Sequence, residues 1–567
     1  MKRVPSTRRV LSTLAIACMA VVTSAHVGTN TTIYDGEAGP YDIRVVIRPP
    51  DVIPGIAEVS VRVRGAGSSA GAGNVAHVTV QPFQWNAGPR GAPPPDTAVA
   101  VPGDEELYSA DLWLMTRSSY NVQVHVAGSR GEGTAVVPLN AVATETLEMG
   151  TGYGLMLAGM GLFLFFGAVT IVGAAVRESV VPPGEEPGQE RRTRSWIVMG
   201  VSAVVLGGLI FFGGRWWDAV EAQTRSLLYR PLQVESSVSV AESSVSVGTP
   251  GEPVDASADP AVPGGNLRIL TLEILDEDFR NGRWTPLVPD HGKLMHMWAV
   301  SEDLGSVAHL HPVRRDATRF DVAVPEALPG GTYRIYADIT HESGFAHTLV
   351  DTVRVPATGG RSESGNAAGT GEPPPTDVRR DDGSADVGPD PDDSWLVASQ
   401  ESVGSPEHPV VPLSDGSIVT WIDAGPLTAG ADTTLVFRVT GPDGEAVVLE
   451  PYMGMTGHAA VATPDGSVFA HLHPVGTISM AAREAFELRS RGDTTPGSVA
   501  RRMSGHAGMT DTTGAVGVID TAAGAGSGRP GRVSFPFAFP EAGDYRIWVQ
   551  VKRSGRVLTG AFDVQVD

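Results

Sequence analysis

The chain has 567 residues, enough for several domains, and its formal net charge of −22 at pH 7 argues against nucleic acid and anionic lipid as partners. Its single cysteine, Cys18, leaves no thiolate in the remainder, which excludes zinc ribbons, iron–sulfur sites and blue-copper centres there. Any metal chemistry must therefore use other side chains.

The first residues predict an export signal. A basic stretch with Lys2 and Arg3 is followed by an apolar run from 10 to 22 and by the small residues 23–25. Segment 1–25 is therefore expected to be a removed signal peptide, which leaves His26 as the mature amino terminus. An amino-terminal histidine can bind copper through its amine and its imidazole, so His26 is a candidate ligand.

Short alternating apolar stretches punctuated by Gly and Pro predict a β-sandwich over 26–150. Two uncharged runs, 152–176 and 196–214, are long enough to be transmembrane helices. The arginines of segment 177–194 predict a cytoplasmic loop, which places both flanking regions on the extracytoplasmic (periplasmic) side of the cytoplasmic (inner) membrane. Neither run carries Asp, Glu, Lys, Arg or His, which indicates a membrane anchor.

Two further β-sandwich domains are predicted at 266–356 and 394–567. They are separated by linkers rich in Ser, Gly, Pro and Asp, at 234–265 and at 357–393, and the second linker is expected to be disordered. Unequal spacing of matching motifs predicts a low-complexity insertion near 481–530, expected to be a surface loop in which Met503, His506 and Met509 are alternative soft-metal ligands. The predicted fold class is mainly β, with three immunoglobulin-like or cupredoxin-like β-sandwich domains plus two transmembrane helices.

One motif occurs twice and gives the strongest functional signal. Residues 295–312 read MHMWAVSEDLGSVAHLHP, and residues 457–474 read GHAAVATPDGSVFAHLHP. In each copy a lone histidine stands thirteen positions before a His-Leu-His-Pro segment. Three imidazoles at one spacing favour a metal site. The candidate ligands are His296, His309 and His311 in the first copy and His458, His471 and His473 in the second.

Hairpin geometry explains why these histidines would converge. Asp465-Gly466 predicts a two-residue type I′ turn, which pairs His458 with the histidine at 473 and Ala460 with His471. The three imidazoles of this copy then share one face. The same register pairs His296 with the histidine at 311. The alternative interpretation is a pair of hairpins with partly buried, hydrogen-bonded histidines that a domain duplication has repeated.

The neighbouring methionines bear on the choice of metal. Met453 and Met455 precede His458 among glycines that let the backbone turn a thioether inward, whereas Met295 and Met297 are expected to be core residues. Thioether with imidazole suits copper, particularly Cu(I), and imidazole alone suits Cu(II) or Zn(II). The predicted cofactor is therefore copper, with zinc as the second choice, and Met453 and Met455 are candidate ligands.

The apolar strand with its histidine and the His-x-His-Pro segment resemble exported YtkA-like β-sandwich proteins, an uncharacterised family associated with heavy-metal handling, over 291–340 and 450–480. The amino-terminal region is similar to CopC-type and YtkA/FixH-like sandwiches in its all-β pattern and in His26. The leading hypothesis is a membrane-anchored extracytoplasmic protein for copper binding or tolerance. The alternatives are a non-metal envelope scaffold or adhesion protein with an unidentified protein partner, and a metal-dependent oxidase or hydrolase. No nucleophile or acid–base carboxylate accompanies the histidines in a recognisable arrangement, so no enzymatic activity is predicted.

Overall fold

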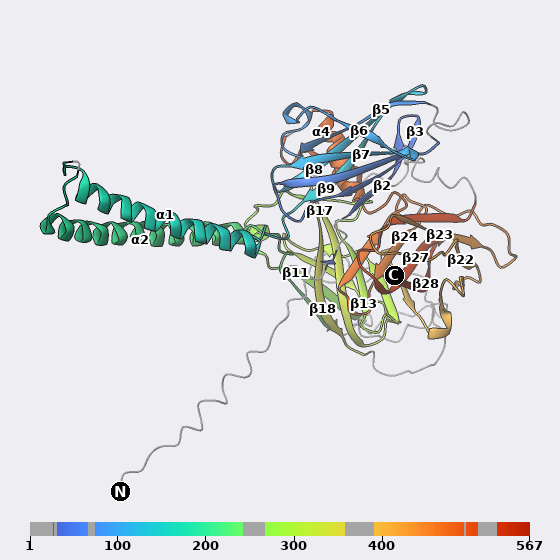
Figure 1. Cartoon of the computed structure of the whole chain (residues 1–567). Coiled ribbons are helices and arrows are strands. Elements are labelled where there is room, and N and C mark those ends of the chain that lie inside the picture. The colour runs from blue at the N-terminus through green and yellow to red at the C-terminus, as the bar shows by residue number, and fades with distance from the viewer. Residues whose placement is uncertain are drawn as a thin grey trace, which may run out of the picture.

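The chain is mainly β, with three sandwich-like units and a pair of long helices that projects from them (Figure 1). In this computed structural model the described residues are 26–27, 31–65, 74–182, 184–241, 267–357, 390–492, 495–507 and 530–567. The predicted signal peptide, most of the two predicted linkers and residues 508–529 of the insertion lie outside this part of the chain.

The N-terminal unit is one eight-stranded antiparallel sheet whose two end strands lie against each other around an apolar core. Alternation of buried and exposed residues along each strand, as at Gly55–Val63, forms this core because successive side chains point to opposite faces. In sheet order the strands are β2 (Thr32–Ala38), β3 (Tyr41–Arg48), β4 (Gly55–Val63), β7 (Asp104–Leu114), β6 (Asp96–Val101), β5 (Val75–Gln84), β8 (Ser118–Gly128) and β9 (Gly131–Ala141). A short 3₁₀ helix, η1 (Pro89–Gly91), follows β5.

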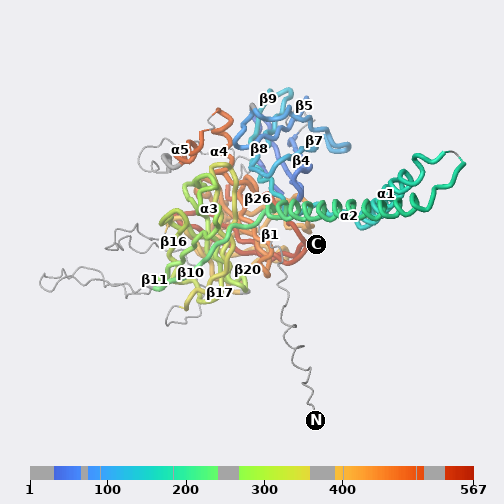
Figure 2. The backbone as a smooth tube through the Cα atoms, turned by 90° about the vertical axis from the view of Figure 1, so that its left-hand side faces the viewer, coloured from blue at the N-terminus to red at the C-terminus, as the bar shows by residue number. Residues whose placement is uncertain are grey.

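Two helices, α1 (Thr151–Glu178) and α2 (Gln189–Ser226), form the projecting hairpin (Figure 2). Both are long and apolar enough to cross a membrane, and they contain the two predicted spans. The loop predicted at 177–194 is shorter than expected. Arg191, Arg192 and Arg194 belong to the first turns of α2, because nothing in their sequence prevents the helix from extending beyond its apolar run.

The first repeat, which contains the first histidine motif, has two sheets. One sheet has β10 (Val234–Ala241), β11 (Leu267–Ile274), β16 (Arg319–Ala323) and β15 (Val313–Arg314). The other has β12 (Leu287–Val288), β17 (Gly331–His341), β13 (His296–Ser301), β14 (Ser306–Leu310), β19 (Ser394–Val397) and, against β17, β18 (Ala346–Val355); a short helix, α3 (Glu277–Arg280), follows β11.

Two predicted boundaries of this repeat are wrong. Residues 234–241, predicted as linker, form β10, because their Ser-Val alternation lets a strand pair with β11 along its whole length. Residues 394–397, assigned to the next domain, form β19, which pairs with β14 of the first repeat. Asp390 and Asp393, predicted as part of a disordered linker, therefore lie next to His311 of that repeat, and Asp392 accepts from Lys552 of the second repeat.

The second repeat, which contains the second motif, repeats this plan. One sheet has β21 (Val410–Pro412), β22 (Ile418–Ile422), β23 (Thr433–Thr440) and β26 (Arg532–Phe537). The other has β25 (Val468–Leu472), β24 (His458–Ala462), β27 (Gly543–Arg553), β28 (Arg556–Val566) and β20 (Val403–Gly404), which follows η2 (Gln400–Ser402), with β1 (His26–Val27) at its edge.

The insertion of the second repeat is partly helical, which corrects the surface loop expected from its composition. Helix α4 (Met480–Ser490) packs on β9 and β17 (Figure 1). Helix α5 (Ser498–Ala507) packs on β12. The Ser479 side chain caps α4 by accepting from the Ala482 N–H at 3.1 Å. Phe486 of α4 is fully buried and contacts Phe83 of the N-terminal unit. The insertion therefore ties the three units together.

The two repeats dock through the faces that carry their histidine hairpins. One apolar cluster contains Trp298 and Tyr336 of the first repeat with Phe469 and Trp548 of the second, and Tyr336 stacks on Phe469 at 4.1 Å between ring centroids. Strands β13 and β24 are consequently buried on both faces. Such strands read as continuous apolar runs without alternation.

Candidate metal centre

The two hairpins have the predicted register but not the predicted turn. Ala460 pairs with His471, and Met297 pairs with Leu310, as the sequence predicts. The turn at Asp465-Gly466 is not type I′, which requires a positive φ at both central residues. Only Gly466 has a positive φ there, and its N–H donates to the Thr463 carbonyl, so the loop is longer but has the same centre. The facing pairs are therefore unchanged.

The two predicted histidine clusters form a single buried centre, because the hairpins of the two repeats face each other. The ring centroid of His471, from the second repeat, lies 5.6 Å from that of His296 and 5.3 Å from that of His309, both from the first repeat. His309 in turn lies 6.2 Å from His458. Five of the six predicted histidines are at most 6 % exposed as whole residues. The side chain of the sixth, His471, is 6 % exposed.

A seventh histidine, His291, joins the centre from the turn before β13. Its ring centroid lies 5.7 Å from that of His458 and 5.5 Å from that of His473. Sequence reasoning missed it because it lies outside the repeated motif. The available signal was its position directly upstream of the motif, in a Pro-Asp-His-Gly segment that aligns with Pro-Tyr-Met-Gly in the second repeat.

Two groups of three imidazoles have nitrogen atoms close enough to share an ion. In each group the ligand atoms lie within 4.8 Å of one another, and the two groups are His291, His458 and His473, and His296, His309 and His311. A third group joins His311 to Asp390 and Asp393. Its carboxylates are already engaged, since Asp390 pairs with Lys293 and Asp393 accepts from the His311 backbone N–H at 2.9 Å.

Hydrogen bonds fix the ring orientation of the histidines in the first repeat. His296 Nε2 lies 3.1 Å from the Asp290 carbonyl oxygen, and His309 Nδ1 lies 2.9 Å from Gln550 Oε1. His311 Nδ1 lies 2.9 Å from Asp393 Oδ1. Each acceptor requires the proton on that ring nitrogen, so the other nitrogen carries a lone pair.

The second repeat orients its rings in the same way. His471 Nδ1 lies 3.2 Å from Asp338 Oδ2, and His473 Nδ1 lies 3.1 Å from the Ile478 carbonyl oxygen. Acceptors of this kind are what orient histidines that bind metal through the opposite nitrogen. They also place Asp338 and Gln550 in the centre, two residues that sequence reasoning missed.

Seven ring nitrogens of the centre are buried without a hydrogen-bond partner. They are Nε2 of His291, Nδ1 of His296, Nε2 of His309, His311 and His471, and both ring nitrogens of His458. A buried polar atom without a partner costs about 1–3 kcal/mol. A metal ion bound among these rings would give several of their lone pairs a partner.

Burial also favours the neutral form, which binds metal, in five of the imidazoles. Desolvation, followed by the proximity of the neighbouring histidines, holds the pKa of His296, His309 and His458 well below the ordinary value of 6.5. The same causes lower the pKa of His471 and His473. Desolvation raises the pKa of Asp338 to about 6.

The remaining predicted ligands have separate surroundings. Met453 is buried against Tyr452 and Val557, and Met455 packs into the core of the N-terminal unit. His26 begins β1, but its side chain is outside the part of the chain that the structure describes, as are the side chains of His506 and Met509. Met503 is buried against α4 and β12 in an apolar cluster, away from the histidines. The roles predicted for Met453, Met455 and His26 stay predictions.

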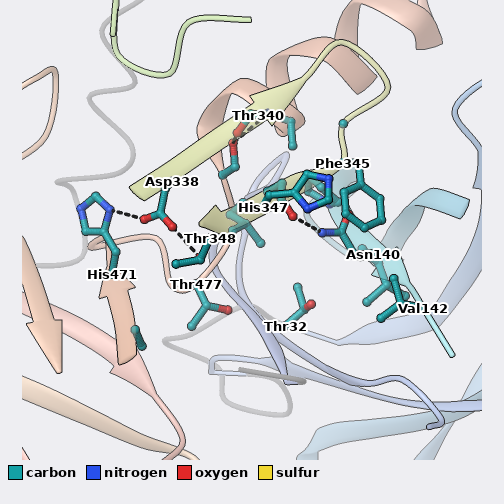
Figure 3. Close-up of a pocket in the computed structure, with 18 of the residues that line it drawn as sticks. Thr32, Asn140, Val142, Asp338, Thr340, Phe345, His347, Thr348, His471 and Thr477 are labelled. Carbon is teal, nitrogen blue, oxygen red and sulfur yellow. Dashed lines mark hydrogen bonds and ion pairs between the residues drawn. The ribbon is translucent and has the colours of Figure 1, made fainter. Parts of the chain in front are cut away.

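A cavity of about 240 Å³ reaches the centre from the junction of the three units. At one end His471 contacts Asp338, which also accepts from Thr348 Oγ1 at 2.5 Å (Figure 3). At the other end Asn140 of the N-terminal unit donates to the Ala346 carbonyl at 2.9 Å. The charged groups in its wall are acidic, which suits the passage of a cation.

Comparisons with known proteins identify a family for part of the chain. Residues 252–357, 411–501 and 505–567, together less than half of the chain, match a family described as "Domain of unknown function (DUF8832)". All seven histidines of the centre lie in these segments. No curated protein matches the chain. The resemblance to YtkA-like and CopC-type proteins stays a prediction.

Solved structures resemble the chain only remotely. A tetra-tandem repeat from the extending region of a large adhesion protein is 10% identical, with 95% of this chain and 93% of that chain covered and a TM-score of 0.13. A putative membrane-anchored protein from Corynebacterium diphtheriae is 8% identical, with 94% and 95% covered and a TM-score of 0.12. Dimeric latent PorU from Porphyromonas gingivalis is 8% identical, with 91% of this chain and 32% of that chain covered and a TM-score of 0.12. TM-scores this low carry no argument about fold or function.

Proposed function

We propose that this chain is a membrane-anchored metal-binding protein that holds copper in a histidine centre shared by its two repeats. The observation that carries the proposal is a set of buried imidazole nitrogens without hydrogen-bond partners, four of them on rings whose opposite nitrogen is held by an acceptor, namely those of His296, His309, His311 and His471. The alternative of merely structural histidines leaves each of these nitrogens unsatisfied at a cost of about 1–3 kcal/mol.

The donor set determines which ions fit. Imidazole binds copper and zinc well, whereas Mg(II) and Ca(II) prefer oxygen ligands. The carboxylates around the centre accept hydrogen bonds from histidine or pair with lysine, so they orient ligands instead of forming an oxygen cage. Copper is the proposed ion because it binds such sites more tightly than zinc does.

The test is the metal content of the full chain, purified in detergent, after incubation with Cu(II) and removal of free ion. We expect the wild type to retain copper and the variant H309A/H311A/H471A/H473A to lose it. The control H77A/H125A removes two histidines of the N-terminal unit that lie together, at 5.8 Å between ring centroids, outside the centre. It should retain wild-type copper. A wild type without copper or zinc, or equal metal in both variants, would refute the proposal.

The same proposal includes a location. Residues 31–141 and the two repeats would lie on the extracytoplasmic side of the cytoplasmic membrane, with the segment between α1 and α2 inside. The support is the arginine cluster at the start of α2, since cytoplasmic loops carry an excess of basic residues. Protease added to intact spheroplasts should digest both β regions, and protection of the repeats would contradict this orientation.

A non-metal envelope scaffold or adhesion protein is the second candidate. In its favour, the three units form direct cross-contacts, such as Arg44 of the N-terminal unit with Asp432 of the second repeat at 3.3 Å. Such packing gives a rigid body beside the anchor without any metal. Two solved structures with remote similarity are described as adhesion and biofilm-associated proteins, but their TM-scores of 0.13 and 0.11 add no weight. The metal analysis separates the two candidates.

A further inference from the structure

The two repeats build the centre with an internal symmetry. Asp338 and Gln550 are equivalent residues, paired across their sheets with His296 and His458 respectively. Asp338 lies against His471 of the second repeat, and Gln550 lies against His309, the equivalent histidine of the first repeat. Each therefore contacts a histidine of the opposite repeat. Contacts exchanged in this way between equivalent positions are those of a two-fold arrangement.

The docking contacts follow the same exchange. Arg334 donates to the Pro464 carbonyl, in the hairpin turn of the second repeat, at 2.9 Å. Its equivalent, Arg546, donates to the Leu304 carbonyl, in the hairpin turn of the first repeat, at 2.8 Å. The pseudo-symmetry therefore extends across the docking face and is not confined to the histidines.

The spacing between rings within each hairpin is nearly the same in both repeats. In the second repeat the centroid distances are 5.4 Å between His458 and His471, 5.1 Å between His458 and His473, and 4.7 Å between the last two. The corresponding distances for His296, His309 and His311 in the first repeat are 5.6, 5.1 and 4.8 Å. Each hairpin thus presents the same three-imidazole arrangement.

The number of donors exceeds what one ion can use. Copper and zinc sites in proteins usually take about four ligands. Seven imidazoles lie in the centre, so a single ion would leave about three of them buried without a partner. Two ions would engage all seven, which agrees with the two groups of close ligand nitrogens, one in His291, His458 and His473 and the other in His296, His309 and His311, with His471 as the seventh imidazole.

We propose that the centre binds two metal ions, one per hairpin, in sites that are related by the internal symmetry but differ in one ligand. The inference rests on the proposed function, and it adds the number of ions and the ligands of each. His458, His471 and His473 hold the first ion with His291 from the turn of the opposite repeat. His296, His309 and His311 hold the second.

The differing ligand comes from equivalent turns. His291 and Met453 occupy the same turn position, with φ of 50° and 49°, each followed by a glycine of positive φ. His291 lies beside the triad of His458, His471 and His473. The symmetry therefore assigns Met453 to the triad of His296, His309 and His311. The first site then offers four imidazoles, which suit Cu(II) or Zn(II), and the second offers three imidazoles and a thioether, which suit Cu(I).

Counting ions on the unmodified full chain tests the proposal without any question of folding. Titration with Zn(II), read by native mass spectrometry in detergent, should show two ions per wild-type chain. One ion per chain would overturn the two-site inference while leaving the proposed function intact, and no bound ion would overturn both. The variants H309A/H311A and H471A/H473A should each keep one ion, and loss of all metal in either would also contradict two separate sites.

The sulfur ligand is tested by M453L, which keeps apolar volume at a buried position. We expect the Cu(I) affinity of one site to fall by at least about tenfold, measured by competition with a Cu(I) chelator, with two Zn(II) ions still bound. The matched control M295L changes a fully buried core methionine next to His296 and should leave the Cu(I) affinity unchanged. Equal Cu(I) affinity in M453L and wild type would remove Met453 from the site.

Discussion

Lowering the pH of the metal-free chain from 7.5 to 5 is expected to destabilise the docked repeats strongly. The pKa values of His296, His309, His458, His471 and His473 are lowered by burial, so the unfolded chain, with pKa values near 6.5, binds more protons than the folded chain. Their contribution to stability is present above pH 6.5 and is lost as the pH falls below it.

The size of the effect follows from the number of groups. Each such histidine removes about 1.4 kcal/mol of stability per pH unit below 6.5. Asp338 acts in the opposite direction, because its pKa is raised to about 6 and its buried carboxyl is protonated as the pH falls. Because five histidines act against one aspartate, the net effect of lowering the pH below 6 is a loss of stability.

Thermal unfolding of the full chain in chelator, followed by circular dichroism from pH 7.5 to 5, measures this loss. A melting temperature that stays constant over the range would contradict the buried, neutral state of the histidines. The Zn(II)-saturated chain is the control, and it should keep its melting temperature to a lower pH because bound metal competes with protons for the same nitrogens.

Replacing Glu342 with Ala is expected to lower the free energy of unfolding by about 3–5 kcal/mol. Glu342, at the end of β17, and Arg489 of α4 form an ion pair at 3.1 Å, and their side chains are 0% and 1% exposed. The carboxylate also accepts from the backbone N–H groups of Gly497 and Val499 at the start of α5. Its removal takes this carboxylate away from a guanidinium whose side chain is 1% exposed.

The matched control for E342A is the double variant E342A/R489M, which removes both charges. Because replacing both members of a buried pair with apolar groups is often nearly neutral, the double variant should recover most of the lost stability. Urea denaturation measures the free energy of unfolding of the single variant and of the double variant. A single variant no less stable than the double variant would show that the pair does not hold the insertion in place.

The sequence predicted the local part of the centre, because hairpin register depends on residues close together in the chain. The pairing of Ala460 with His471 followed from the turn centre alone, even though the turn type was wrong. The non-alternating apolar run of β24 was also visible in the sequence, and it is the mark of a strand covered on both faces.

What joins the two hairpins could not be predicted from local pattern. The docking depends on surfaces far apart in sequence, such as Tyr336 stacked on Phe469. Asp338 and Gln550 belong to the centre only because that docking brings each against a histidine of the other repeat. Helix α4 was missed because its helix-forming residues begin an insertion that is otherwise rich in Gly and Thr, and it is stabilised by burial between units.

The central claim is that both repeats contribute ligands to one metal centre, and X-ray diffraction at the copper absorption edge tests it most directly. In crystals of the full chain prepared with copper, we predict anomalous density within about 2.0–2.1 Å of imidazole nitrogens of the histidine centre, with His291 of the first repeat and His458 of the second bound to the same ion. Copper bound elsewhere on the chain, or the absence of any copper ion bound by histidines of both repeats, would contradict the account.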